Sequence, residues 1–350
     1  MIKNFQIGKF RLNENSKCII VAEISANHTQ SLSKTKKLID GAVKSGADAI
    51  KIQTYTPESL TIISHNVSSK LKKTPWRKFS NRYELFKKAS LPFDWHEELF
   101  SYAKSKKIMM FSSPFSEKDV NFLEKLKCPA YKLASPEITD IPLITSIAKT
   151  RKPVIISLGL ASLKDISLAI DILKKYKSNN FMLLKCTAVY PALPEMLNLD
   201  SINTLKKKFK CQIGFSDHTI GSYAPITASI LGAKLIEKHI KLDDEKKSVD
   251  SFFSTSVTDF GSMVLDIRNA NKSKGSKKYI LDKKSIAEMN TRKSLFAKTN
   301  LKKGMILQKK NIACVRPFSG LHPKFYFKIL GKKIKKDIKI GKSLKLEFFY

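Results

Sequence analysis

Short apolar runs alternate with longer stretches of helical pattern along most of the chain. Eight of the runs have the length of a strand, and they cover residues 18–23, 48–53, 108–113, 130–135, 154–157, 182–186, 212–216 and 235–239. Between them, apolar residues recur with helical spacing over residues 32–45, 94–106, 117–126, 162–176, 198–209 and 221–232. Strands buried on both faces appear in a sequence as continuous apolar runs, so the pattern predicts parallel strands connected by helices.

Eight strand–helix units within the first 275 residues have the size and rhythm of an α/β fold of the (β/α)8 type, the TIM barrel. A doubly wound open sheet is the alternative. The dinucleotide-binding form of that sheet carries Gly-x-Gly-x-x-Gly after its first strand, and no such motif follows residues 18–23. We therefore predict a barrel.

The repeating pattern ends near Gly275, where a polar, lysine-rich linker begins. Beyond it, short segments are separated by turn signals such as Lys303-Gly304 and Gly331-Lys332. We predict two domains, a barrel over residues 1–275 and a small β-rich domain over residues 286–350. The second domain is too short to build a large core of its own.

The 350 residues carry a formal net charge of +35, which raises the question of a polyanionic partner. Only seven of the 65 basic residues are arginines, and the lysines are spread along the whole chain. Proteins that bind nucleic acid usually rely on clustered arginines and a DNA- or RNA-binding motif, and the sequence shows neither. We expect a solvated lysine surface and no nucleic-acid partner.

No apolar run approaches the roughly 18 to 20 residues that cross a bilayer, and the first residues lack the pattern of a signal peptide. We expect a cytoplasmic protein with no membrane partner. The five cysteines are widely spaced and form no Cys-x-x-Cys pair, so we expect buried free thiols rather than disulfides or a zinc site.

All eight apolar runs end in polar side chains. They include Glu23, Lys51, Gln53, Ser113, Lys132, Ser135, Ser157, Lys185, Ser216, His218, Glu237 and His239. In a (β/α)8 barrel the carboxyl ends of the strands converge on one mouth, which is where the active site is built. The sequence therefore predicts a functional site at that end of the barrel.

Two kinds of side chain at these strand ends suggest a chemistry. His218 and His239 end neighbouring strands, where their imidazoles could share a divalent metal ion. Lys51, Lys132 and Lys185 lie inside apolar runs, where a charge must be paired or functional because its desolvation is costly. With the serines of the same rim they suit a phosphate and a carboxylate. A Schiff-base lysine is the competing role.

Three carboxylates complete the predicted mouth. Glu23 and Glu137 could act as base or acid on water or on a sugar hydroxyl. Asp250 follows the last strand and could face the same site, although a helix cap or a surface ion pair would also explain it.

The segment 56–93 is too long for an ordinary strand-to-helix connection and carries Trp76, Arg77, Lys78 and Tyr83. We interpret it as a lid or a substrate loop.

Six segments near the strand ends resemble the sialic-acid synthase family, in the same order along the chain. They are residues 22–28 (Ala-Glu-Ile-Ser-Ala-Asn-His), 46–55, 111–115, 131–135, 215–219 and 237–239. The residues 292–295, 311–312, 315–317 and 320–321 resemble that family's antifreeze-like (SAF) domain. The resemblance thus runs from about residue 18 to the C-terminus and implies a TIM barrel followed by a SAF domain.

Within the family, the segments 25–28, 53–57 and 184–187 are most similar to the branch that makes pseudaminic acid. The N-acetylneuraminate branch tends to have Gly in place of Ser25 and Phe in place of Tyr55, and usually Asn in place of Ala188. The resemblance implies a transferase that condenses phosphoenolpyruvate with the open-chain aldehyde of 2,4-diacetamido-2,4,6-trideoxy-L-altrose. The expected products are pseudaminic acid and phosphate.

The resemblance also implies roles for individual residues. His218 and His239 match the metal ligands, most plausibly for Mn²⁺, with Mg²⁺ or Co²⁺ as alternatives. Glu23 matches the carboxylate that handles the attacking water. Arg316 matches an arginine that reaches the active site of the other subunit, which implies a domain-swapped homodimer.

Combined with the pattern of strand ends, the resemblance gives a set of expected site residues. The expected catalytic residues are Glu23, Lys51 and Asp250. The expected substrate-binding residues are Gln53, Ser113, Lys132, Ser135, Glu137, Ser157, Lys185, Tyr190, Ser216 and Arg316. Two alternatives remain open: a legionaminic or N-acetylneuraminic acid synthase, and a basic anion- or nucleic-acid-binding protein whose barrel has lost catalysis.

Overall fold

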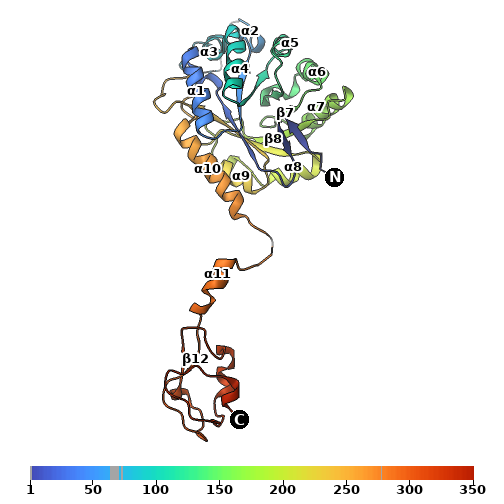
Figure 1. Cartoon of the computed structure of the whole chain (residues 1–350). Helices are drawn as coiled ribbons and strands as arrows, with labels where there is room; N and C mark the ends of the chain where they lie inside the picture. Colours follow the sequence, from blue (N-terminus) through green and yellow to red (C-terminus); the bar gives the residue numbers. More distant parts are fainter. Residues whose placement is uncertain (1, 64–70, 72–73, 277) are drawn as a thin grey trace. The chain divides into compact units, whose positions relative to one another are not determined.

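A computed structural model describes residues 2–63, 71, 74–276 and 278–350. The chain divides into two compact units, Met1–Gly275 and Ser276–Tyr350, which are described separately below. Figure 1 shows both units, with most of the helices and a few of the strands labelled.

Eight parallel strands of the first unit close into a barrel, because the last of them pairs with both the first and the seventh. The strands are β3 (Ile19–Glu23), β4 (Ala49–Thr54), β5 (Met109–Pro114), β6 (Tyr131–Leu133), β7 (Val154–Ser157), β8 (Phe181–Cys186), β9 (Ile213–Asp217) and β10 (Leu235–Lys241). Each lies within two residues of a predicted run. The predicted (β/α)8 barrel is confirmed, and an open doubly wound sheet is excluded by the closing pairs.

Amphipathic helices surround the strands (Figure 1). They are α1 (Leu32–Lys44), α4 (His96–Ser105), α5 (Glu117–Lys125), α6 (Ile141–Thr150), α7 (Leu163–Lys175), α8 (Ser201–Phe209), α9 (Tyr223–Ile230) and α10 (Val257–Ser273). Several begin at a serine whose hydroxyl accepts a hydrogen bond from a backbone N–H of the first turn, as Ser31, Ser116, Ser162 and Ser256 do. Their apolar faces pack onto the strands and form one continuous core.

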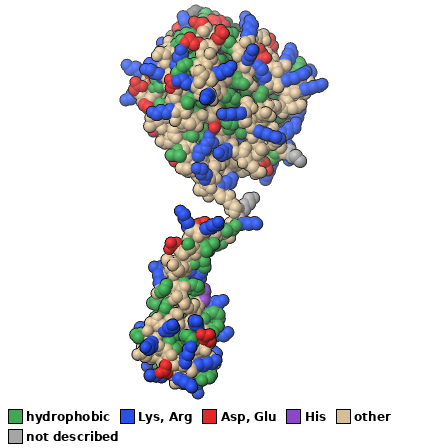
Figure 2. All heavy atoms as spheres, in the orientation of Figure 1, with side chains coloured by type: hydrophobic (Ala, Val, Ile, Leu, Met, Phe, Trp, Pro, Cys, Tyr) green, Lys and Arg blue, Asp and Glu red, His purple; other side chains and the backbone are tan. Residues whose placement is uncertain are grey.

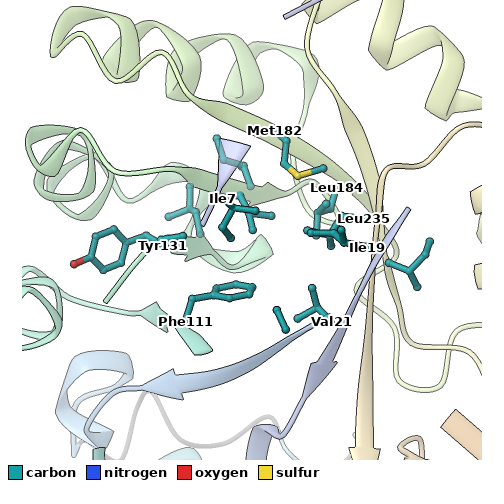
Figure 3. Packing of buried hydrophobic residues seen from close by; sticks show 14 of the residues in the cluster. Ile7, Ile19, Val21, Phe111, Tyr131, Met182, Leu184 and Leu235 are labelled. Atoms are coloured by element: carbon teal, nitrogen blue, oxygen red, sulfur yellow. The ribbon is translucent and has the colours of Figure 1, made fainter. Parts of the chain in front are cut away.

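An N-terminal hairpin that the sequence pattern did not predict lies at one end of the barrel. It consists of β1 (Phe5–Ile7) and β2 (Phe10–Leu12), and its Phe5, Ile7 and Leu12 are buried in the barrel core. Figure 3 shows Ile7 among core residues of several strands. Backbone hydrogen bonds join the hairpin region to loops that precede strands, such as Lys3 N–H to the Lys210 carbonyl. The hairpin therefore covers the amino-terminal end of the strands, and the carboxyl-terminal mouth is the end available for a site.

Further elements gather around this mouth. They are α2 (Pro57–Leu60), α3 (Arg82–Ala89), β11 (Thr255–Ser256) and the short 3₁₀ helices η1 (Ser25–His28), η3 (Phe93–Trp95), η4 (Ser135–Thr139) and η5 (Pro194–Met196). A separate apolar cluster holds the described part of segment 56–93 against the mouth, and it contains Ala26, Tyr55, Leu71, Leu85, Ala89 and Val249. Residues 64–70 and 72–73 of the predicted loop lie outside the described residues.

The second unit has a small core and little regular structure. Its elements are α11 (Lys283–Ala287), β12 (Ser294–Ala297), β13 (Ile312–Val315), α12 (Tyr326–Ile329) and the 3₁₀ helices η6 (Glu288–Thr291), η7 (Lys309–Asn311), η8 (Pro323–Phe325) and η9 (Leu346–Phe348). Strands β12 and β13 pair antiparallel, and isolated bridges join the remaining turns. Leu295, Leu301, Ile329, Ile334 and Leu344 lie at the centre of its apolar cluster.

The surface and the cysteines agree with the sequence analysis. Lysines and arginines are spread over the face shown in Figure 2 rather than gathered into one stripe. All five cysteines are free, and four of them are buried. None of the described helices is long and apolar enough to cross a membrane.

Candidate active site

Side chains from several strands meet at the mouth because alternate residues of a strand point to the same face. On β4 these are Lys51 and Gln53, and on β10 they are Glu237 and His239. Glu23 ends β3 beside them, in register with Lys51 on one side and His239 on the other. The mouth thus collects polar groups from strands that are far apart in sequence.

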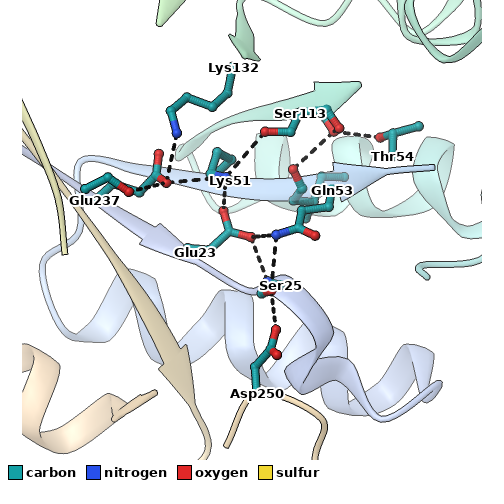
Figure 4. Close-up of polar contacts among 12 residues, drawn as sticks. Glu23, Ser25, Lys51, Gln53, Thr54, Ser113, Lys132, Glu237 and Asp250 are labelled. Carbon is teal, nitrogen blue, oxygen red and sulfur yellow. Dashed lines mark hydrogen bonds and ion pairs between the residues drawn. The ribbon is translucent and has the colours of Figure 1, made fainter. Parts of the chain in front are cut away.

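A buried network of ion pairs lies at the base of the mouth (Figure 4). Lys51 Nζ lies 2.7 Å from Glu23 Oε2 and 3.4 Å from Glu237 Oε1. Lys132 Nζ lies 3.2 Å from the same Glu237 oxygen. None of these four residues is more than 3% exposed, so each charge relies on its partners rather than on water.

Glu237 is one of the residues of this network to which no role was assigned from the sequence. Its position at a polar strand end was noted, but no role was given to it. In the structure it neutralises both lysines through one oxygen, which also accepts a hydrogen bond from the Ser216 hydroxyl at 3.3 Å. The signal that could have identified it was its spacing from His239, since two residues apart on one strand means the same face of the barrel.

The network holds its two carboxyl groups in different states. Burial raises the pKa of Glu23 above its ordinary value, although Lys51 opposes the shift. Burial alone would also raise the pKa of Glu237, but Lys132 and Lys51 lower it to about 2. Glu237 is therefore a fixed negative charge, whereas Glu23 is the carboxyl group of the pair that can take up a proton.

The two lysines also differ. Burial lowers the pKa of Lys132 below its ordinary value in spite of Glu237, whereas the pKa of Lys51 is raised because Glu23 and Glu237 outweigh the effect of burial. Lys132 is thus incompletely neutralised. An additional anion beside it would stabilise its charged form, which suits this end of the mouth to an anionic ligand.

Serine hydroxyl groups also lie at or just after the carboxyl ends of the strands. The Ser113 hydroxyl accepts a hydrogen bond from Lys51 at 3.4 Å, and the Ser135 hydroxyl accepts one from the Leu160 N–H at 2.8 Å. The Ser157 hydroxyl is buried and has no hydrogen-bond partner among the residues that the structure describes. An unpaired buried hydroxyl is costly, so this group is available to bind a ligand oxygen.

Ser25 connects the network to Asp250. Its hydroxyl donates to Asp250 Oδ2 at 2.5 Å, its N–H donates to Glu23 Oε1 at 2.9 Å, and Gln53 Nε2 donates to its hydroxyl at 3.2 Å. Its backbone lies in the left-handed region with φ at 46°, which is uncommon for a residue with a side chain. The bond to Asp250 offsets that strain and holds the carboxylate at the mouth. The sequence analysis gave Ser25 no such role.

The two histidines lie together, with their ring centroids 5.4 Å apart. The Nδ1–H of His218 donates to the Thr187 carbonyl at 2.8 Å, which leaves Nε2 free to bind a ligand. His239 Nδ1 is buried and without a hydrogen-bond partner in the described part of the chain, and burial lowers the pKa of His239 well below its ordinary value. A divalent metal ion requires a neutral imidazole with an unpaired nitrogen, and His239 meets both conditions. Burial alone would lower the pKa of His218, but Cys186 and the Thr187 carbonyl raise it, so His218 would bind a metal ion after losing a proton.

The histidine pair would hold a metal ion with help from other ligands. The described residues contain no group of three or more histidine, cysteine, aspartate or glutamate side chains arranged to bind a metal. The protein would therefore supply two ligands, and water and substrate oxygens would supply the rest.

Glu137 lies in η4, half-buried, with one carboxyl oxygen enclosed and unpaired among the described residues. Burial raises its pKa from 4.5 to about 7. The ring of Tyr190 lies 4.3 Å from that of His218. Both predicted sugar-side residues thus lie close to groups of the mouth.

One predicted site residue of the barrel, Lys185, is not brought to the others. On β8, Cys186 contacts His218, so the alternation of the strand points the neighbouring Lys185 to the other face. Lys185 Nζ donates to the Cys186 carbonyl at 3.0 Å. Arg316 follows β13 in the second unit and is exposed there.

Comparison with known proteins places the chain in context. Residues 38–279 match the NeuB family, and residues 292–349 match the SAF domain. The pseudaminic acid synthase of Campylobacter jejuni (serotype O:23/36, strain 81-176) is 44% identical over 340 residues, which is 97% of this chain and 98% of that protein.

Two further comparisons give the range of similarity. The N,N'-diacetyllegionaminic acid synthase of Campylobacter jejuni is 35% identical over 331 residues, covering 92% of this chain and 97% of that protein. Among solved structures, the N-acetylneuraminic acid synthetase of Leptospira borgpetersenii, in complex with citrate, superposes with a TM-score of 0.72. It is 30% identical and covers 83% of this chain and 96% of that one.

The raised pKa of Glu137 predicts a pH-dependent stability. The folded protein binds more protons than the unfolded chain between pH 4.5 and about 7, so Glu137 lowers the stability of the fold as the pH rises through that window. Glu137→Gln removes this effect. We expect the variant to match the wild type at pH 5 and to exceed it by about 1–3 kcal/mol at pH 8 in urea unfolding. Glu195→Gln, at an exposed site in η5, is the control, and equal stabilities of Glu137→Gln and wild type at pH 8 would contradict the assignment.

Proposed function

Because the chain belongs to the NeuB family, we propose that it is a pseudaminic acid synthase. The reaction condenses phosphoenolpyruvate with 2,4-diacetamido-2,4,6-trideoxy-L-altrose and water, and yields pseudaminic acid and phosphate. The observation that carries this choice of acceptor is the 44% identity to the Campylobacter jejuni pseudaminic acid synthase across nearly the whole of both chains. Identity to the legionaminic acid synthase of the same species is lower, at 35%.

The lysine-rich end of the mouth binds phosphoenolpyruvate in this proposal. Lys51 and Lys132 face its negative charges, and the hydroxyl groups of Ser113, Ser135, Ser157 and Ser216 donate to its phosphate and carboxylate oxygens. Glu237 holds both ammonium groups in place before the substrate arrives. Fixed cations of this kind stabilise charge without reorganising during the reaction.

The bond changes follow without a protein nucleophile. C3 of phosphoenolpyruvate forms the new bond to the aldehyde carbon of the sugar, and the aldehyde oxygen takes up the electron pair and a proton. Water adds to C2 and loses a proton to Glu23, whose raised pKa suits it to accept one. The bond from C2 to the phosphate oxygen then breaks, which releases phosphate and leaves the keto group.

The other carboxyl groups act on the sugar side. Asp250, held by Ser25 and the Ala26 N–H, and Glu137, with its unpaired oxygen, accept hydrogen bonds from the hydroxyl groups of the acceptor. Gln53 Nε2 donates hydrogen bonds to Glu23 and to the Ser25 hydroxyl, and so connects the phosphoenolpyruvate end of the mouth to the sugar end. These residues orient the aldehyde toward phosphoenolpyruvate.

His218 and His239 would hold a divalent metal ion, most plausibly Mn²⁺. A bound divalent cation supplies a Lewis acid at the aldehyde oxygen. The Thr187 carbonyl fixes the orientation of the His218 ring through Nδ1.

A homodimer in which Arg316 completes the site of the other subunit is also part of the proposal. Arg316 is exposed on its own unit, and its guanidinium group can bind a carboxylate through two hydrogen bonds. This role rests on the resemblance of the segment 315–317 to the SAF domain, which residues 292–349 match.

The test of the acceptor is phosphate release from phosphoenolpyruvate in the presence of Mn²⁺ and a panel of acetamido sugars. We expect turnover with the diacetamido-trideoxy-altrose and little with N-acetylmannosamine or the legionaminic acid precursor. Reactions without sugar give the background rate. Preferred turnover of either other sugar would replace the proposed acceptor. No turnover with any sugar, together with nucleic-acid binding that collapses in salt, would favour the non-catalytic alternative.

The metal site is tested by Mn²⁺ titration calorimetry on the purified protein. His218→Ala and His239→Ala should each weaken Mn²⁺ binding by at least roughly 10- to 100-fold, which is the loss seen when only a hydrogen-bond partner of a metal ligand is removed. Circular dichroism should show that both variants remain folded. His322→Ala removes a histidine of the second unit and should leave the affinity unchanged. Wild-type affinity in either barrel variant would remove the metal assignment.

The shared site is tested by mixing two inactive variants. Arg316→Ala keeps an intact barrel, and His218→Ala keeps an intact arginine, so a mixed dimer contains one complete site if the arginine acts across subunits. We expect random mixing by refolding to restore about one quarter of the wild-type sites. If the mixture stays as inactive as its components, Arg316 does not act in the partner's site.

A further inference from the structure

A continuous set of aromatic rings leads from the two histidines to Trp76, which packs against the apolar cluster beside the mouth. The Tyr190 ring lies 4.3 Å from His218, and the Trp76 ring lies 5.6 Å from Tyr190. Phe252 extends the set, with its ring 5.7 Å from Trp76. Phe253 fills the space behind, 5.0 Å from both Tyr190 and Phe252 and 4.8 Å from His239.

Trp76 is held in a defined position rather than lying free on the surface. Its indole N–H donates to the Val249 carbonyl at 3.2 Å, and its ring packs against the apolar cluster that contains Val249 and Leu85. Trp76 is half-buried, so part of the ring is accessible. Val249 precedes Asp250 in the chain, so this hydrogen bond places Trp76 beside the carboxylate that binds the sugar in the proposed function.

The two ends of the mouth therefore differ in chemistry. The lysines and serines provide charges and hydroxyl groups for phosphoenolpyruvate, whereas Trp76, Tyr190 and Phe252 present rings with no charge among them. An aromatic wall binds the apolar face of a ligand and leaves its hydroxyl groups to neighbouring polar groups, here the carboxylate of Asp250. The sugar of the proposed reaction carries three methyl groups, one at C6 and one in each acetamido group, whereas N-acetylmannosamine carries one.

On the basis of the proposed function, we propose that Trp76 is a specificity-determining residue that forms, with Tyr190 and Phe252, an apolar wall for the methyl groups of the acceptor. A hydroxyl group at C6 or C4 would lie against this wall without a hydrogen-bond partner. Discrimination by an apolar pocket for one such group amounts to about 10- to 200-fold. Trp76 thereby contributes to the preference for a deoxy-diacetamido sugar.

The kinetic test compares Trp76→Ala, Trp76→Phe and Arg77→Ala in steady-state phosphate release. Trp76→Ala should raise KM for the diacetamido sugar about 10-fold. The ratio of kcat/KM for the diacetamido sugar to kcat/KM for N-acetylmannosamine should fall by a similar factor, about 10-fold. KM for phosphoenolpyruvate should stay within about twofold of the wild-type value. Trp76→Phe keeps a ring but loses the N–H, and should retain most of the preference. Arg77→Ala, at an exposed neighbour, should behave as the wild type.

A binding measurement gives a readout that does not depend on turnover. The chain has two tryptophans, and Trp95→Phe leaves Trp76 as the single reporter. The reduced open-chain form of the acceptor lacks the reacting aldehyde and can be titrated without reaction. We expect it to change the emission of Trp76 in a saturable manner, and phosphoenolpyruvate alone to have little effect.

The outcomes separate this inference from the proposed function. If the wild type turns over the diacetamido sugar, but Trp76→Ala keeps the full preference or lowers kcat alike for both sugars, the inference is overturned and the function stands. If the wild type prefers another acetamido sugar, the proposed function fails, and the emission change with the reduced form of that sugar decides whether Trp76 contacts the acceptor. No emission change with any reduced acetamido sugar overturns the inference.

Discussion

The buried ion network of Lys51, Lys132, Glu23 and Glu237 is the interaction on which the rest of the site depends. Four ionisable groups at the base of a barrel mouth would each be strongly destabilising alone, and they persist because each lies within 3.4 Å of an opposite charge. Removal of one partner would leave the others uncompensated. The network thus keeps two ammonium groups in an enclosed site, where their attraction for an anion is weakly screened.

In the proposed reaction the same network prepares the site for phosphoenolpyruvate. Glu237 stays ionised and fixes the lysines, whereas Glu23 has a raised pKa and can hold a proton. Burial lowers the pKa of Lys132, and an anion bound beside it would stabilise the charged form of this lysine. Charge can therefore enter the site and leave it as phosphate with little rearrangement of the protein, since the compensating groups are already in place.

The acceptor end follows a different principle. Ser25 adopts a left-handed backbone conformation, and its hydroxyl donates a hydrogen bond to Asp250. The two residues are 225 positions apart in the chain. Glycine would adopt that backbone with less strain but could not donate the hydrogen bond. The side chain at this position therefore decides how firmly Asp250 is held. Beside it, the aromatic rings of Trp76, Tyr190 and Phe252 come from three segments and form an apolar surface next to this carboxylate.

Much of this protein was determined by local signals in the sequence. The eight strands, six of the eight helices that surround them and the polar strand ends were predicted, because burial on both faces and helical periodicity leave direct patterns in the chain. The helices α6 and α10 were not predicted. The N-terminal hairpin was missed because two three-residue strands are too short for such a pattern. Only the tertiary structure decided that one Glu237 oxygen contacts two lysines, that Trp76 packs against the ring of Tyr190, and that the side chains of Lys185 and Cys186 leave opposite faces of β8. Those facts depend on the face of the strand on which each side chain lies and on contacts between segments that are distant in the sequence. The pairing of the strands determines both, and local composition determines neither.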